Sequence, residues 1–243
     1  MKEFSKTFYL AAGECNPQGE MPLPLMVNRI IEVATLHANS WGVGYRHLIA
    51  QNHAWVLSSV VVEMERFPRV DTDYTLTTWI EDYNRHFSQR NFEIRDGEGK
   101  TLGYARTIWV VIDLLTRTSV DISSLEYIRV NITGHPCPIA PRSRLRPLEE
   151  GSDVTHRFGY AECDFNRHVN TVRYLELILN RFTLDYFDRM MPRRLELIFS
   201  KETHYGEEAL LRMAETAPDD WQVNIIAGGD DHVRSRVMFV ARN

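Results

Sequence analysis

The stretch Glu162–Glu176, ECDFNRHVNTVRYLE, is the most informative part of this chain. Within it Asp164, Asn166 and His168 alternate, so an extended or loop backbone would project a carboxylate, a carboxamide and an imidazole to one side. Asn170 then stands where the N-cap of a helix is expected. The stretch therefore predicts three polar side chains gathered immediately before a helix.

An amphipathic helix pattern follows directly behind these polar residues. Apolar side chains at helical spacing predict a helix at about 170–186; they are Val172, Leu175, Ile178, Leu179 and Phe182. Polar groups held at the mouth of a buried helix suit acid–base chemistry on a carbonyl. The alternative interpretation is structural, because Asp and Asn before a helix often serve only as caps and turn formers.

The bulk composition narrows the class of protein. With 243 residues the chain can form one large domain or two small ones, and 44% hydrophobic residues permit a sizeable core. A formal net charge of −5 argues against nucleic-acid binding. No run approaches the roughly 18 apolar residues of a membrane span, and Met1–Lys6 lacks the apolar core of a secretory signal. The 3 cysteines are too scattered for a disulfide framework, so we expect a cytoplasmic protein with no membrane partner.

The order of predicted elements repeats along the chain. In the first half a helical pattern at 22–39 precedes strand candidates at 53–64, 73–80, 87–94 and 102–115. In the second half the helix at 170–186 precedes strand candidates at 194–204, 209–214, 222–227 and 232–241. The lead-in to each helix also recurs, as Gly13–Asn16 and as Ala161–Asp164. This order predicts an α+β fold with a duplicated unit of one long helix and a strongly bent antiparallel sheet.

A segment of different composition separates the two halves. Residues 132–151 hold prolines at a density that excludes regular strand pairing, so we expect an extended linker there. The predicted domains are therefore residues 1–131 and residues 152–243, joined by this linker. The linker also carries basic side chains, which are either solvated charges or a stripe for an acidic partner; they are Arg142, Arg144 and Arg146.

The block Asp164–Asn170, DFNRHVN, followed by Tyr174, resembles the active-site motif of plant and bacterial acyl-ACP thioesterases. Its helix start is also similar to the wider hotdog thioesterase superfamily. Leu197–Thr203, LIFSKET, is similar to the strand of that family that carries a glutamate followed by a cysteine. The helix at 22–39 and the stretch Gly103–Val111 resemble the corresponding elements of the family's first half, so the likeness covers most of the chain.

This resemblance implies a double hotdog, two fused units that each have a long central helix wrapped by an antiparallel sheet. It also implies hydrolysis of the thioester between a fatty acyl chain and acyl carrier protein in fatty acid biosynthesis, and we expect neither a cofactor nor a metal. Carried over by position, the catalytic set is Asp164, Asn166, His168 and Glu202. Thr203 stands where the family has its cysteine, so a cysteine thiolate cannot be the nucleophile at that position.

Without a cysteine nucleophile, hydrolysis of the thioester is expected to depend on carboxylates. Asp164 or Glu202 can take a proton from water or attack the carbonyl directly, and the sequence leaves that choice open. The amide of Asn166 can donate to the substrate carbonyl, and the helix start near Asn170 favours a developing oxyanion. His168 can orient a carboxylate and carry the proton.

The first half lacks this polar set, because Asn16, Gln18 and Glu20 stand at the equivalent places. We therefore expect the second half to carry the chemistry and the first half to supply an apolar tunnel for the acyl chain, as the resemblance also suggests. The candidate wall residues are Met26, Ile30, Trp55, Leu57 and Trp79. The alternative for each of them is a place in the hydrophobic core.

The expected partner is acyl carrier protein. Such carriers are generally acidic, so docking to this net-negative chain needs a local basic patch. Arg193, Arg194 and Lys201 near the catalytic strand are the main candidates, and the linker arginines are the weaker ones. The sequence leaves open whether the protein is a monomer or a homodimer.

Three alternatives remain at this level. A metal site of Asp164, His168 and His204 is the weakest, because no His-x-His or Cys pair supports it. An acyl-CoA thioesterase of the hotdog superfamily would use the same residues on a different substrate. A non-catalytic acyl-binding module would need no catalytic set, and the intact set argues against it.

Overall fold

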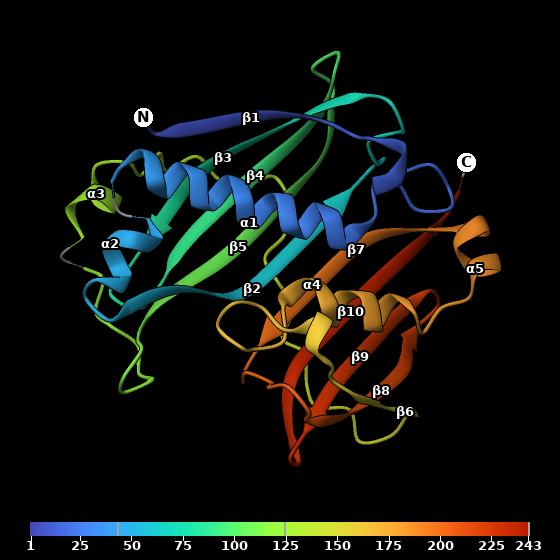
Figure 1. The fold of residues 1–243 in the computed structure, drawn as a ribbon. Helices are drawn as coiled ribbons and strands as arrows, with labels where there is room; N and C mark the ends of the chain where they lie inside the picture. Colours follow the sequence, from blue (N-terminus) through green and yellow to red (C-terminus); the bar gives the residue numbers. More distant parts are fainter. Residues whose placement is uncertain (43, 124, 243) are drawn as a thin grey trace. The chain divides into compact units, whose positions relative to one another are not determined.

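The computed structural model describes residues 1–42, 44–123 and 125–242. These form two compact units, Met1–Pro141 (unit 1) and Arg142–Asn243 (unit 2). Each unit combines an antiparallel sheet with helices, as Figure 1 shows. None of the described helices has the length and apolar character that crossing a membrane requires.

The sheet of unit 1 has the strand order β1-β3-β4-β5-β2, with antiparallel neighbours. The four strands predicted for this unit, at 53–64, 73–80, 87–94 and 102–115, are confirmed with small shifts at their ends. The first strand was not predicted, because it lies at the sheet edge and its residues alternate between exposed and half-buried. The strands are β1 (Glu3–Tyr9), β2 (His53–Met64), β3 (Asp73–Tyr83), β4 (Ser88–Asp96) and β5 (Thr101–Asp113).

Helix α1 (Leu23–Ser40) packs against β1 and β3 and runs across one face of the sheet in unit 1 (Figure 1). Pro22 occupies its N-cap, where a missing backbone N–H costs little. One side of the helix is buried at helical spacing and includes Met26, Ile30 and His37. The predicted helix at 22–39 is therefore confirmed. Two short helices also belong to this unit, α2 (Tyr45–Ile49) and α3 (Glu126–Arg129).

The sheet of unit 2 has the strand order β7-β10-β9-β8-β6, again with antiparallel neighbours. The four predicted strands exist, but the first of them covers residues 190–199 rather than 194–204. β6 was not predicted, because it is an edge strand whose residues are almost all exposed. The strands are β6 (Ser152–Arg157), β7 (Met190–Phe199), β8 (Glu208–Ala217), β9 (Asp220–Ala227) and β10 (Asp230–Ala241).

The prediction of one helix at 170–186 was wrong. The structure has two helices there, α4 (Thr171–Leu179) and α5 (Leu184–Arg189). Asn180 caps the end of α4, and the hydroxyl of Thr183 accepts a hydrogen bond from the backbone N–H of Tyr186 to begin α5. Phe182, between the helices, packs against aromatic rings that include Phe239. Capping and tertiary packing therefore interrupt a pattern that periodicity alone would continue.

Residues 132–151 contain no regular strand, as their prolines predicted. Polar side chains of each sheet bind their backbone instead. In unit 1 the indole N–H of Trp79 donates to the carbonyl of His135 at 2.7 Å. In unit 2 buried Glu196 accepts from the backbone N–H of Ser143 at 2.7 Å, and Gln222 donates to the carbonyl of Arg146 at 2.6 Å. The segment is therefore fixed to the sheets by hydrogen bonds, and among the described residues its strand pairing is limited to an isolated bridge between Ile132 and Ile80 of β3.

Candidate active site

The loop before α4 is built around the side chain of Asp164. Its Oδ1 accepts hydrogen bonds from the backbone N–H groups of Asn166 at 2.8 Å and His168 at 3.2 Å. The backbone N–H of Asp164 donates to the carbonyl of His168, and Arg167 adopts a φ of 67° to complete the turn. The backbone here is the loop that the sequence allowed beside an extended strand, and it folds back so that the side chain of Asp164 binds its own loop.

The end of this loop is fastened to the start of α4 and to the segment after β7. Asn170 is the N-cap of α4, and its side chain accepts from the N–H of Val172 at 3.0 Å, as predicted. The N–H of Val169 donates to the carbonyl of Thr203 at 2.8 Å. His168 and His204 form an isolated β-bridge. These bonds bring two distant sequence blocks together at the N-terminus of α4.

His168 and Glu202 meet as a result of this arrangement. The Nδ1 atom of His168 lies 3.3 Å from Oε1 of Glu202, and the two side chains are 22% and 34% exposed. The ring of His204 lies edge-on to that of His168, with 4.9 Å between centroids. Asn166 is exposed at the tip of the same loop. A carboxylate and an imidazole are thus paired, yet remain accessible to a substrate.

A buried layer that residue spacing does not predict lies directly beneath this pair. The hydroxyl of Thr203 is fully buried and lies 2.8 Å from Nδ1 of His232. Burial lowers the pKa of His232. Tyr174 also interacts with Thr203, and burial raises the pKa of Tyr174 to about 12. Both groups are therefore neutral near pH 7. A neutral imidazole can accept a proton from a hydroxyl, but Thr203 is fully buried, so its hydroxyl is not exposed to a substrate carbonyl in this arrangement.

The three residues of the alternative metal site, Asp164, His168 and His204, do not converge on one point. His168 and His204 are neighbours, but Oδ1 of Asp164 is turned back onto its own loop. Among the described residues, no three His, Cys, Asp or Glu side chains are grouped to hold a metal ion.

The expected docking patch needs a correction at Arg194. This side chain is 8% exposed, and its Nε donates to buried Glu196 at 2.8 Å, so it cannot present a charge to a partner. Arg193 is half-buried, and Lys201 is exposed with its Nζ 2.6 Å from Asp230. The linker arginines are exposed; they are Arg142, Arg144 and Arg146.

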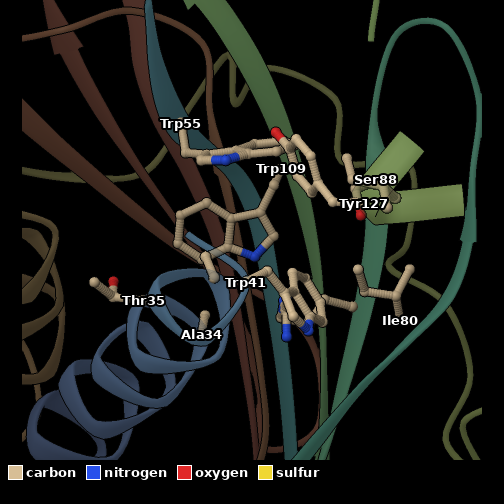
Figure 2. Close-up of a pocket in the computed structure, with 11 residues that line it drawn as sticks. Ala34, Thr35, Trp41, Trp55, Ile80, Ser88, Trp109 and Tyr127 are labelled. Carbon is tan, nitrogen blue, oxygen red and sulfur yellow. The ribbon is translucent and has the colours of Figure 1, made fainter. Parts of the chain in front are cut away.

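A cavity of about 460 Å³, counting space open to solvent, lies in unit 1 between α1 and the sheet. Figure 2 shows Trp41, Trp55, Trp109 and Tyr127 gathered around it. Trp55 is one of the five predicted wall residues. The other four are buried in unit 1 outside the lining of this cavity, and their contact with an acyl chain stays a prediction; they are Met26, Ile30, Leu57 and Trp79.

Comparison with known proteins gives one consistent relationship. The family model of the acyl-ACP thioesterase N-terminal domain matches residues 1–128, and that of the C-terminal domain matches residues 146–239. An acyl-ACP thioesterase from Bacteroides thetaiotaomicron is 30% identical, with a TM-score of 0.91 over 98% of both chains. The 12:0-ACP thioesterase from Umbellularia californica has a TM-score of 0.88 at 18% identity, over 100% of this chain and 98% of that one, and shows the shared fold.

Curated relatives agree with this assignment. The chloroplastic palmitoyl-acyl carrier protein thioesterase from Arabidopsis thaliana is 22% identical over 93% of this chain. That alignment covers 58% of the relative, so the chain spans little more than half the length of the curated proteins it matches. With the antiparallel sheet and few helices described above, the fold is the hotdog fold of these enzymes. The chain belongs to the acyl-ACP thioesterase family.

Proposed function

We propose that this protein hydrolyses fatty acyl-ACP thioesters and releases free fatty acid and holo-ACP in fatty acid biosynthesis. The observation that carries the proposal is the approach of His168 to Glu202 at 3.3 Å, beside the N-terminus of α4. Membership of the acyl-ACP thioesterase family supports the choice of substrate.

In the proposed mechanism Glu202 acts first. Its carboxylate takes a proton from a water molecule whose oxygen attacks the thioester carbonyl carbon. The positive end of the α4 dipole favours the negative charge that develops on the carbonyl oxygen. The intermediate then expels the thiolate, and His168 carries the proton from Glu202 to the sulfur. Direct attack by Glu202 to give an anhydride is the alternative route, and it needs the same two residues.

Asp164 and Asn166 have different tasks in this scheme. Asp164 closes the loop with two backbone hydrogen bonds and so fixes the main chain at His168. The carboxylate of Asp164 is also the alternative to Glu202 as the group that takes the proton from water. Asn166 lies exposed at the loop tip, where its amide N–H can donate to the substrate carbonyl.

The proposal divides the work between two fused hotdog units. Unit 2 carries the chemistry, because the pair of His168 and Glu202 belongs to it. Unit 1 binds the acyl chain, because its tryptophan-lined cavity suits an aliphatic chain. The repeated order of helix and strands in the two units supports an origin by duplication.

Docking of the carrier protein would depend on exposed basic side chains. An acidic acyl carrier protein would be steered by exposed cations, and Arg144 and Lys201 are exposed whereas Arg194 is not. Reversing Arg144 and Lys201 to Glu should raise KM for acyl-ACP and weaken its salt dependence. Hydrolysis of a small acyl thioester without the carrier should not change. Equal loss on both substrates would contradict a docking role.

The deciding experiment measures thiol release from a chain-length series of acyl-ACPs and from acyl-CoAs of matched length. We expect kcat/KM for at least one acyl-ACP to exceed that for its acyl-CoA partner. A preference for the CoA series would make this an acyl-CoA thioesterase. Fatty-acid binding without hydrolysis of either series would make it a binding module.

A further inference from the structure

A cation lies on the apolar face of the sheet in unit 1. Ser88, Arg90, Phe92 and Ile94 alternate along β4 and are all buried. Arg90 is only 6% exposed. A buried guanidinium without a counter-charge is costly, so its surroundings need a physical explanation.

The partners of Arg90 in the protein are neutral, and they include the ring of Trp41, whose centroid lies 5.7 Å from the guanidinium carbon. Its Nη1 donates to Nδ1 of His37 at 2.9 Å and lies 3.3 Å from the hydroxyl of Thr78. Nε2 of His37 lies 3.1 Å from the carbonyl of Met1, so each ring nitrogen has one partner. Burial, and next the charge of Arg90, lower the pKa of His37 to about 4, which keeps this imidazole neutral near pH 7.

One edge of the guanidinium, Nε and Nη2, has no acceptor among the described residues. Among the described residues no carboxylate pairs with Arg90, and none accepts a hydrogen bond from its Nε or Nη2. Burial lowers the pKa of Arg90 to about 9, so the group still carries its charge at neutral pH. The Nε and Nη2 donors form the side-by-side fork that binds both oxygens of a carboxylate.

A second polar group without a partner lines the same cavity. The hydroxyl of Tyr127 is buried and makes no hydrogen bond within the described part of the chain. Burial raises its pKa to about 12, so it is a neutral hydroxyl that can donate. Figure 2 shows the ring of Tyr127 beside Trp55 and Trp109 in the wall of the cavity. The cavity therefore has aromatic walls and two groups of hydrogen-bond donors that lack an acceptor among the described residues. They are Nε and Nη2 of Arg90 and the hydroxyl of Tyr127.

We infer that the cavity of unit 1 holds the far end of an acyl chain that carries a carboxylate there, paired with the Nε and Nη2 edge of Arg90, with the hydroxyl of Tyr127 as a second donor in the same lining. The inference rests on the proposed function and names its substrate class: the thioester of a dicarboxylic acid, with its second carboxylate free. The tryptophans would contact the methylene groups between the two ends. A plain hydrocarbon end would cover the cation without neutralising it, and a hydroxyl end would leave the charge uncompensated.

The test compares acyl-ACPs of equal length that end in a methyl group, a hydroxyl group or a carboxylate. Wild-type protein should show kcat/KM at least about tenfold higher for the carboxylate end than for the methyl end. Arg90→Met should remove or reverse this ratio. Tyr127→Phe, which breaks no hydrogen bond among the described residues, should reduce the ratio and leave folding intact. Ser88→Ala alters the same lining without touching its charge and should leave the ratio unchanged.

Two results would overturn the inference: a methyl or hydroxyl end preferred by wild-type protein, or a ratio that Arg90→Met and Tyr127→Phe leave unchanged. If no thioester is hydrolysed, the proposed function fails, and calorimetric titration with the monomethyl ester of a dicarboxylic acid decides the inference separately. Binding of the monoester that Tyr127→Phe weakens and Arg90→Met abolishes would support the carboxylate site. Absence of binding to wild-type protein would refute it.

Discussion

The loops that precede α1 and α4 have the same backbone design but different chemistry. In unit 1 a short 3-10 turn, η1 (Ala12–Glu14), leads to Asn16, whose Oδ1 accepts from the N–H groups of Gln18 and Glu20 at 3.1 and 2.9 Å. In unit 2 the turn η2 (Tyr160–Glu162) leads to Asp164, which accepts the two corresponding bonds. The short side chain at this place is therefore required by the turn itself, before any chemistry is considered.

The loops differ at their last residue. In unit 1 this residue is Glu20, which is buried and lies 3.3 Å from Arg69 in an ion pair. In unit 2 it is His168, which lies 3.3 Å from Glu202 and stays accessible. The same scaffold thus ends in a closed structural pair in one unit and in an acid–base pair in the other. The loop therefore positions the residue, whereas its partner after the following strand decides what it can do.

The largest expected effect comes from breaking the pair that only unit 2 has. His168→Gln and Glu202→Gln should each lower kcat by about a hundredfold or more, because each removes a group that transfers a proton. Both residues are partly exposed, so the melting temperature should hardly change. Glu20→Gln is the matched control in unit 1: it should lower the melting temperature but not kcat. Turnover near wild-type in both unit 2 variants would rule out the mechanism.

Asp164→Asn gives the loop of unit 2 the residue that the loop of unit 1 has at the same place, Asn16. Asn16 shows that a carboxamide oxygen can accept both backbone bonds, so thermal stability should be retained. The loss of negative charge should lower kcat at least about tenfold, which corresponds to about 1.4 kcal/mol. Asp164→Ala should in addition lower the free energy of unfolding by about 1 kcal/mol, because both donors lose their acceptor. An unstable Asp164→Asn variant would show that the two loops are not equivalent.

Thr203 tests the buried layer that supports the pair. Thr203→Val keeps the shape of the side chain but leaves Nδ1 of His232 without its partner, so the free energy of unfolding should fall by about 1–3 kcal/mol. Most activity should remain below the new melting temperature, and thiol alkylation should not abolish it. Chemical denaturation and steady-state kinetics on the same samples separate the two effects. Inactivation of a fully folded Thr203→Val variant would indicate a threonine nucleophile.

The smallest expected effect concerns backbone strain. Arg167 has a φ of 67°, and its counterpart Gly19 has a φ of 68°. This conformation costs a residue with a side chain about 1 kcal/mol relative to glycine. Arg167→Gly should therefore raise the melting temperature by a few degrees, and Gly19→Arg should lower it. Opposite signs in thermal denaturation would mean that the side chain of Arg167 stabilises the loop by more than the strain costs.

The sequence predicted those parts of the fold that depend on local pattern. The helix of unit 1 and most strands follow from apolar periodicity, and Asn170 is the N-cap that its position before the helix predicted. The edge strands β1 and β6 were not found, because half-exposed residues give little alternation of apolar and polar side chains. The break between α4 and α5 was also not found, because the capping by Thr183 competes with an apolar pattern that continues through Phe182.

For the candidate site, the sequence alone determined which chemical groups are available and which are missing: the acid, amide and imidazole before α4, Glu202 after β7, and Thr203 in place of a thiol. How these groups are used depends on the tertiary structure. It turned Asp164 into the centre of a loop, buried Arg194 against Glu196, and placed His232 beside Thr203. The roles of Arg90 and Tyr127 were not predicted for the same reason. Residue spacing reports local backbone geometry, whereas burial and pairing depend on contacts between residues far apart in the chain.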